Sequence, residues 1–151
     1  IPCLVVLDKL IKANEASVFS ARWFVENRDK NGSCAVANGN SFTLERPNAK
    51  LMGVCAGSPE IGLQSMILPL PDSVGVFPYL DVAAKQKAKA AFIITVGVPL
   101  KTDENPPDIS ANLAQNAWIV EVSKAEKKFK LKIFDRNELP EFEIVEYPHK
   151  P

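Results

Sequence analysis

Three cysteines, Cys3, Cys34 and Cys55, are the residues of this chain whose type and spacing most clearly offer chemistry. A single buried thiol behaves as a small hydrophobic group and indicates little about function. Three cysteines near the start of the chain, close to an N-glycosylation acceptor triplet, suggest a secreted domain that is held together by a disulfide. Because their number is odd, one thiol is expected to have no partner within the chain.

The acceptor triplet is Asn31-Gly32-Ser33, directly before Cys34. Such triplets arise often by chance, but a glycine turn beside a cysteine is expected to be exposed in a secreted fold. The sequence therefore predicts Asn31 as a glycosylation site.

The other polar residues do not form a recognisable catalytic or metal centre. The histidine, His149, lies in a polar tail close to the C-terminus, which is a poor place for a general base. The cysteines and this histidine lack the spacing of zinc ligands, and the glycines form no phosphate-binding loop. We therefore predict no catalytic residues, no metal and no cofactor.

Two groups of residues keep other interpretations open. A glycosidase needs two facing carboxylates, and Glu121, Glu141 and Glu143 on expected strands are the ones to check for clustering. Trp23 and Trp118 lie within apolar runs, so we expect them in the core, with an exposed binding platform as the alternative.

Composition places the chain among ordinary globular domains. Its 151 residues fit one domain, and 46% hydrophobic against 24% charged residues argues against disorder. Eighteen basic residues balance eighteen acidic ones, so no net field attracts nucleic acid or an anionic membrane. The longest apolar run, Ala90 to Leu100, is too short to span a bilayer. Since the chain begins at Ile1 without methionine, we expect a processed product or an excised module.

The pattern of apolar residues and turns indicates mostly strands. Alternation is clearest in Trp118 to Val122 and in Phe129 to Phe134, which should form a hairpin whose outer face is charged. Asn38-Gly39-Asn40 is a strong turn signal. The remaining expected strands are Leu4 to Leu7, Val18 to Glu26, Ser41 to Glu45, Leu51 to Cys55, Phe92 to Val98 and Phe142 to Tyr147.

The middle of the chain is interpreted differently. Prolines and a Gly75 turn break Met66 to Tyr79 into loop or edge strand, and Lys101 to Asp108 reads as a polar loop. Asp81 is a plausible N-cap for a helix over Val82 to Ala91, which is rich in Ala, Lys and Gln. The prediction is a β-rich sandwich with one short helix.

The cysteine pattern resembles that of the ZP-N domain, the immunoglobulin-like module of animal egg coats. That module opens with a cysteine before its first strand, matched by Cys3 in PCLVVLDKL. Its second and third cysteines pair with each other, which the resemblance transfers to Cys34 in NGSCAV and Cys55 in GVCAGS. It closes with a cysteine, one residue and Tyr-Pro; here Val145 stands in the place of that cysteine, before Tyr147-Pro148.

The resemblance implies an immunoglobulin-like (ZP-N type) β-sandwich over residues 1–151 with a Cys34–Cys55 disulfide. The family pairs its first and fourth cysteines, so Cys3 should be a free thiol or bridge to a second chain as a disulfide-linked dimer. The segment Ala56 to Pro140 is unusually long for the family, and an alternative register puts the closing strand at Ile94 to Pro99.

An enlarged repeat without the last cysteine is similar to the abalone vitelline-envelope repeats that bind sperm lysin. The implied role is structural and non-enzymatic: the module is secreted, assembles with neighbouring egg-coat repeats in the extracellular matrix and binds a lysin-like sperm protein. Because lysin is basic and this chain is neutral, local acidic or apolar patches would have to provide the attraction.

Sheet edges and exposed apolar loops are the natural interface of such a module. Phe77, Pro78 and Tyr79 form a candidate contact, with burial at the edge of the core as the stronger alternative. Other hypotheses are a secreted β-sandwich or trefoil protease inhibitor that inserts Leu68 to Pro78 or Asn105 to Asp108, a two-carboxylate carbohydrate-active enzyme, and an intracellular domain with reduced cysteines.

Overall fold

The computed structural model describes residues 1–71, 73–136 and 139–146, with the backbone alone at position 146. All regular elements in these ranges are β-strands. The described ranges contain no helix that could span a bilayer. The strands are β1 (Leu4–Ile11), β2 (Ser20–Phe24), β3 (Ser33–Ala37), β4 (Ser41–Arg46), β5 (Ala49–Ser58), β6 (Ile61–Ile67), β7 (Pro78–Ala84), β8 (Ala90–Lys101), β9 (Asp108–Ala114), β10 (Ala117–Lys124), β11 (Lys127–Phe134) and β12 (Glu141–Glu146).

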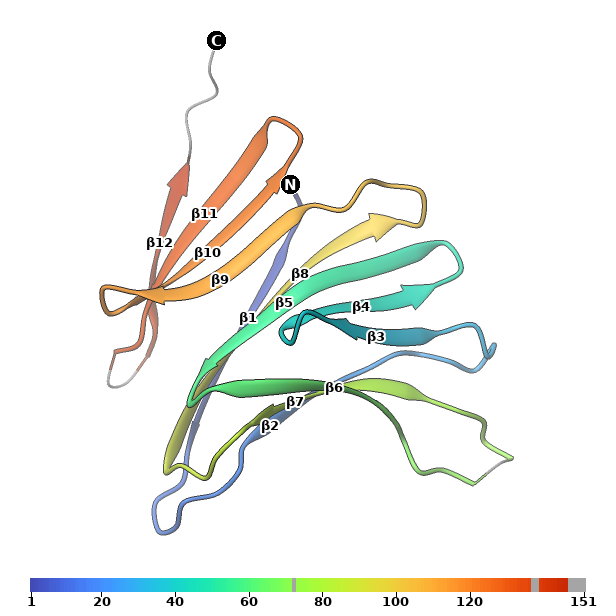
Figure 1. Cartoon of the computed structure of the whole chain (residues 1–151), viewed down its shortest axis with the longest axis horizontal. Coiled ribbons are helices and arrows are strands. Elements are labelled where there is room, and N and C mark those ends of the chain that lie inside the picture. Colours follow the sequence, from blue (N-terminus) through green and yellow to red (C-terminus); the bar gives the residue numbers. More distant parts are fainter. Residues whose placement is uncertain (72, 137–138, 147–151) are drawn as a thin grey trace.

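The strands form three antiparallel sheets. A five-stranded sheet has the order β1-β8-β5-β4-β3, a four-stranded sheet the order β12-β11-β10-β9, and a three-stranded sheet the order β2-β7-β6. The five-stranded sheet lies between the other two (Figure 1). We call it the central sheet. Its long strand β8 pairs with both β1 and β5, so it joins the two halves of the layer.

One face of the central sheet packs on the four-stranded sheet. Alternate residues of β8 face this core, and alternate residues of β10 and β11 meet them from the other side. The fully buried members include Ile94, Val96, Val120 and Ile133. The predicted alternation in these two hairpin strands is confirmed, and Lys130 and Lys132 lie on the opposite, outer face.

The other face of the central sheet packs on the three-stranded sheet. Phe42, Cys55 and Ile93 from the central sheet meet Leu80 and Val82 of β7 in a second core. Both faces of β8 are therefore buried, which explains why its sequence reads as a continuous apolar run and not as an alternating one.

The predicted helix over Val82 to Ala91 is wrong. Val82 and Ala84 belong to β7, where their side chains are 0% and 4% exposed, and the residues from Lys85 to Lys89 form the turn into β8. Val82 pairs with Ala21 on one side and Leu63 on the other. Burial between two neighbouring strands outweighs the helix propensity of the Ala- and Lys-rich sequence, because propensity is worth only tenths of a kcal/mol per residue.

The β-rich prediction is confirmed, and the structure is consistent with a β-sandwich. Strands β3, β6 and β9 were not predicted, since each is short or mostly exposed and carries a weak apolar pattern. The Met66 to Tyr79 segment contains the end of β6, a loop and the start of β7. The predicted last strand is β12, although Tyr147 lies outside the described residues.

Candidate interaction site

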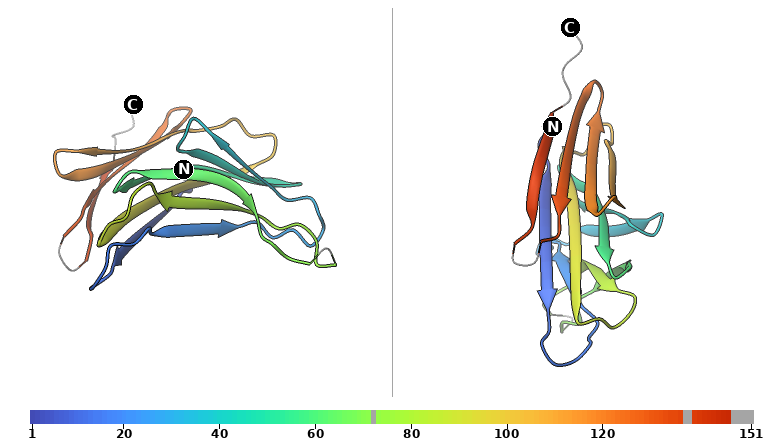
Figure 2. Two further views of the ribbon diagram at one scale, coloured as in Figure 1. Left: turned by 60° about the horizontal axis from the view of Figure 1, so that its bottom comes forward. Right: turned by 90° about the vertical axis from the view of Figure 1, so that its left-hand side faces the viewer.

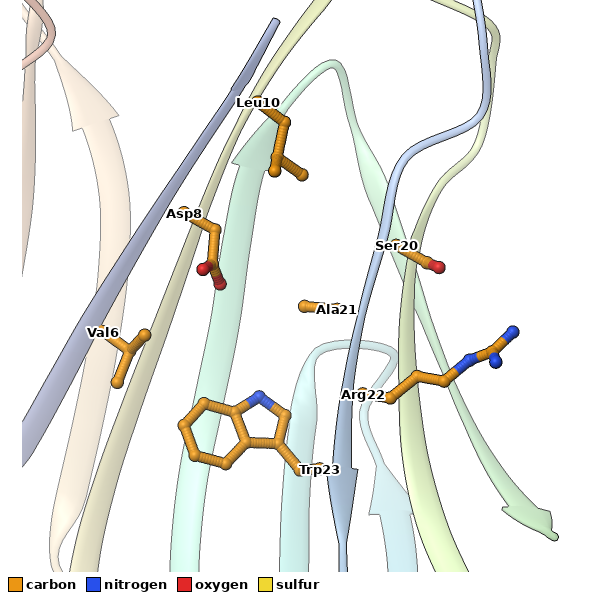
Figure 3. A pocket seen from close by; sticks show the side chains of 7 residues that line it. All are labelled: Val6, Asp8, Leu10, Ser20, Ala21, Arg22 and Trp23. Carbon is orange, nitrogen blue, oxygen red and sulfur yellow. The ribbon is translucent and has the colours of Figure 1, made fainter.

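A pocket of about 300 Å³ opens between the outermost strand of the central sheet and the outermost strand of the three-stranded sheet. Among the residues that the structure describes, β1 pairs only with β8 and β2 only with β7, so each strand has one backbone edge without a described partner strand. We call this cavity the β1 pocket. The residues that line it are Val6, Asp8, Leu10, Ser20, Ala21, Arg22 and Trp23 (Figure 3).

The alternation of β1 places Asp8 in this pocket. Asp8 pairs with the fully buried Ile93 and shares its face of the sheet, between Val6 and Leu10. The Asp8 carboxylate makes no hydrogen bond or ion pair with the residues that the structure describes. A half-buried carboxylate without such partners favours a cationic or hydrogen-bond-donating ligand.

Trp23 forms the opposite wall of the pocket. Its indole ring points from β2 across the cavity toward Val6 and Asp8 (Figure 3). The ring is partly buried against the second core, so its orientation is fixed by packing. It therefore offers a rigid apolar surface with one N–H donor beside a carboxylate.

The cation of Arg22 does not neutralise Asp8. Its Nε donates to Asp81 Oδ1 at 3.0 Å, and its guanidinium lies 5.6 Å from the centre of the Tyr79 ring. Figure 3 shows its side chain directed away from Asp8. The Ser20 side chain likewise points away from Asp8 (Figure 3), so the side chains that point into the pocket are apolar except for the Asp8 carboxylate and the Trp23 N–H.

The last strand, β12, has two large apolar side chains that are exposed on the side of the four-stranded sheet that faces the central sheet. Phe142 and Ile144 pair with the buried Ile133 and Leu131 and share their core-facing side of the four-stranded sheet. Nevertheless they are 67% and 56% exposed. We call these two residues the β12 overhang.

The overhang arises from how the two sheets are offset. Lys9 of β1 donates to Asp135 Oδ1 at 2.8 Å, just after the end of β11, so this end of β11 lies near β1. β12 is the next strand outward, and the exposure of Phe142 and Ile144 shows that the described residues leave its core-facing side largely uncovered. The right-hand view of Figure 2 shows β12 and β1 toward the same edge of the molecule.

The three cysteines are free thiols and lie at separate places. Cys3 packs against the first core, whereas Cys34 and Cys55 belong to or contact the second. The register aligns Cys34 with Leu44 and Leu51, four residues from Cys55 along β5. Two strand spacings and four residue rises separate their Cα atoms by roughly 16 Å, against about 4–7 Å in a disulfide. A Cys34–Cys55 bridge would need a different register.

Burial raises the pKa of all three thiols. It raises the pKa of Cys55, which is 1% exposed, to about 11, although a contact with the Thr95 hydroxyl acts in the opposite direction. For Cys3 and Cys34 the same cause raises the pKa by less, because both are only partly buried. None of the three has the lowered pKa of a reactive cysteine.

The predicted glycosylation residue is accessible. Asn31 and Ser33 are both exposed, and the Asn31 backbone N–H donates to Asp29 Oδ1 at 3.1 Å in the turn before β3. The amide side chain of Asn31 is therefore open to modification, and glycosylation itself stays a prediction.

The proposed contact at Phe77, Pro78 and Tyr79 is mostly buried. Pro78 and Tyr79 are buried and Phe77 is partly buried. Phe24 covers Tyr79 from β2, with the ring centres 5.2 Å apart. The exposed apolar residues in this region are instead Phe24, Met66, Ile67, Leu70, Val74 and Val76.

The carboxylates that were singled out do not face one another across a cleft. Glu121 accepts from Lys130 Nζ at 2.7 Å, Glu143 lies 3.5 Å from Lys132 Nζ, and the lysines of β11 stand between them. No group of three or more His, Cys, Asp or Glu side chains within the described ranges is arranged to hold a metal ion. His149 lies outside the described residues.

The two tryptophans differ. Trp118 is in the first core at 7% exposure and stacks near Phe92, as expected. Trp23 fits both the core and the binding-platform interpretation, because it contacts the second core and also lines the β1 pocket. Asp8 was not identified from the sequence, although one acidic residue within the apolar segment LVVLDKLI is a signal for a polar position on a packed face.

No protein-family model, curated protein or solved structure matches this chain.

Proposed function

We propose that this chain is a recognition module that binds another protein at the β1 pocket, without an enzymatic step. The observation that supports the proposal best is the Asp8 carboxylate, which lacks a partner among the described residues and lies beside a rigid indole ring, on the outermost strand of the central sheet. Interfaces are enriched in aromatic anchors and in charges that find their counterpart only in the complex. Unpaired strand edges likewise invite association.

Site-specific photo-crosslinking tests this proposal. A photoreactive residue at position 6, which is half-buried and lines the pocket on the same face as Asp8, should crosslink to a discrete protein in an extract of the source tissue. The same residue at position 112, exposed on β9 across the molecule, is the control. Asp8→Lys should abolish the crosslink from position 6. Equal crosslinking from both positions, or no effect of Asp8→Lys, would contradict the proposal.

The resemblance to ZP-N domains adds a finer proposal about where this recognition takes place. The partner would be a lysin-like sperm protein or a neighbouring repeat of a secreted egg coat. The β-rich fold and the residues around Cys3, Cys34 and Cys55 support this identification. It requires the Cys34–Cys55 disulfide, whereas the strand register keeps these residues apart. Peptide mapping without reduction decides between the disulfide and the described register. A linked Cys34–Cys55 peptide would support the egg-coat proposal, and unlinked peptides would exclude it.

A protease inhibitor remains a second candidate because of the loop between β6 and β7. Leu70, Val74 and Val76 are 37%, 52% and 54% exposed in that loop, as residues that enter a protease cleft must be. A panel of proteases tests this function. Tight inhibition that is lost after one cut between Leu70 and Val76 would support it, and the absence of inhibition would exclude it.

A further inference from the structure

We propose that the partner contributes one extended strand, which pairs with the free edge of β1 and lies between the β12 overhang and the β1 pocket. This inference rests on the proposed function and specifies the form of the ligand. It further assigns a basic residue to the ligand strand, at the position that faces Asp8.

The backbone of β1 provides the pairing edge. β1 spans eight residues and pairs over its whole length with β8, and no strand within the described ranges pairs with its other side. A strand added on the other side would lie about 4.8 Å from β1 and continue the central sheet. Main-chain hydrogen bonds would then supply affinity, and pockets for alternate side chains would supply specificity.

Both faces of such a strand would find apolar surface. Successive side chains of a strand point to opposite faces of its sheet. On one face they would lie beneath Phe142 and Ile144, which already point toward that layer and are uncovered there. On the other face they would enter the β1 pocket against Val6, Leu10 and Trp23. Each outer sheet thus supplies a wall for a sixth strand of the central sheet.

Charge and shape together define the occupant. Asp8 is the acidic group of the pocket, and the Arg22 cation is directed away from it, so a lysine or arginine is the complementary residue. The occupant must also be a single strand. If a second copy of this chain paired through its own β1, the β12 strands of both copies would compete for the space above the joined edge, because β12 and β1 lie toward the same edge of the molecule (Figure 2).

A peptide library provides the test. Peptides of about eight residues, the length of β1, alternate apolar and small residues and carry Lys, Glu or Gln at the centre. Binding is followed by tryptophan fluorescence, with Trp23→Phe to show that the signal comes from the pocket. Lys-centred peptides should bind about tenfold more tightly than Glu-centred ones, and Asp8→Asn should remove this preference.

Matched variants test the β12 overhang. Phe142→Ser should weaken binding about tenfold, because the ligand then loses one apolar contact surface. Leu113→Ser is the control, since Leu113 is 58% exposed at the opposite edge of the same sheet and on the same face. It should leave affinity unchanged. An equal loss in both variants would overturn the proposal.

Backbone methylation separates strand pairing from other modes of binding. A Lys-centred peptide N-methylated at alternate residues on its pairing edge should lose affinity, whereas methylation on the other edge should not matter. Binding that depends on Asp8 and Trp23 but tolerates both methylation patterns overturns strand addition and leaves the proposed function standing. The strand proposal is also overturned if no peptide binds, or if substitutions of Asp8 and Trp23 leave binding unchanged. In either case the crosslinking experiment tests the proposed function separately. Concentration-dependent self-association through β1 would also overturn it.

Discussion

At the residue scale, close packing at Gly53 fixes how β4 and β5 meet. A Cβ atom at position 53 would lie 2.2 Å from the Val96 carbonyl oxygen and 2.5 Å from Phe42 Cζ. The Phe42 ring therefore lies over the glycine backbone and fills the second core, where it is 2% exposed. The sequence shows a glycine in a strand but gives no means of telling which aromatic ring covers it.

Gly53→Ala should lower the free energy of unfolding by about 1–3 kcal/mol, because a backbone atom must move to make room. The control is Gly62→Ala, where the nearest atom to the added Cβ is Lys85 Cε at 3.7 Å. That variant should be close to neutral. Urea denaturation of both proteins measures the difference, and equal stabilities would contradict the close packing of Val96 and Phe42 around Gly53.

The Asp29–Arg46 pair is the second feature at this scale. Two nitrogens of Arg46 donate to the two carboxylate oxygens of Asp29 at 2.7 and 2.6 Å, and this pair holds the pKa of Asp29 below its ordinary value of 3.8. A folded-state pKa below the unfolded one contributes stability above the unfolded pKa. That contribution is lost as the pH falls through the folded value.

Asp29→Asn should lower the melting temperature at pH 7 by no more than about 3 °C, since both partners are partly exposed. The difference from the wild type should vanish as the solution is acidified below the folded-state pKa of Asp29. Asp103→Asn, at an exposed carboxylate with no ion pair among the described residues, should show no such pH dependence. Scanning calorimetry from pH 7 to acid measures both. A difference that grows on acidification would contradict the assigned ion pair.

At the scale of elements, alternation predicted the faces of β10, β11 and β12 correctly, because these strands carry a charged outer side. It did not predict how much each core-facing residue is covered. Ile133 and Phe142 are neighbours on one face, yet the first is 0% and the second 67% exposed. Coverage depends on the offset between two sheets, which no local pattern encodes. The wrong helix at Val82 has the same origin, since its neighbours Ala21 and Leu63 are distant in sequence.

Ile133→Ala should cost about 2–5 kcal/mol, because it leaves a cavity in the first core. Phe142→Ala should change the free energy of unfolding by less than about 0.5 kcal/mol, as at other exposed positions. Denaturant unfolding of the two variants provides the comparison. Similar losses would mean that the β12 overhang is in fact covered, and the space proposed for a ligand strand would not exist.

At the scale of the whole molecule, three layers of sheet surround two cores, and the cysteines are distributed between them. The sequence could predict a β-rich domain and strands near the cysteines. It could not predict that the central sheet places Cys34 and Cys55 in different cross-strand rows, because register is set by the packing of β3, β4 and β5 together. The pocket around Asp8 could not be predicted for the same reason, because it forms only when β2 packs beside β1.

Alkylation of the native protein near pH 8 should modify Cys3 and Cys34 at least about tenfold faster than Cys55, whose raised pKa and burial both suppress the thiolate. After unfolding without reductant, all three thiols should react equally. Mass spectrometry of the labelled peptides gives the rates. If Cys34 and Cys55 stay unlabelled after unfolding, a disulfide joins them and the described register is wrong.

Amide hydrogen exchange of β1, with and without a bound Lys-centred peptide, tests the central claim most directly. We expect alternate amides between Leu4 and Ile11, those directed away from β8, to become protected when the peptide binds, while amides in β9 at the opposite edge of the four-stranded sheet keep their exchange rates. Unchanged exchange in β1 together with new protection elsewhere would contradict it.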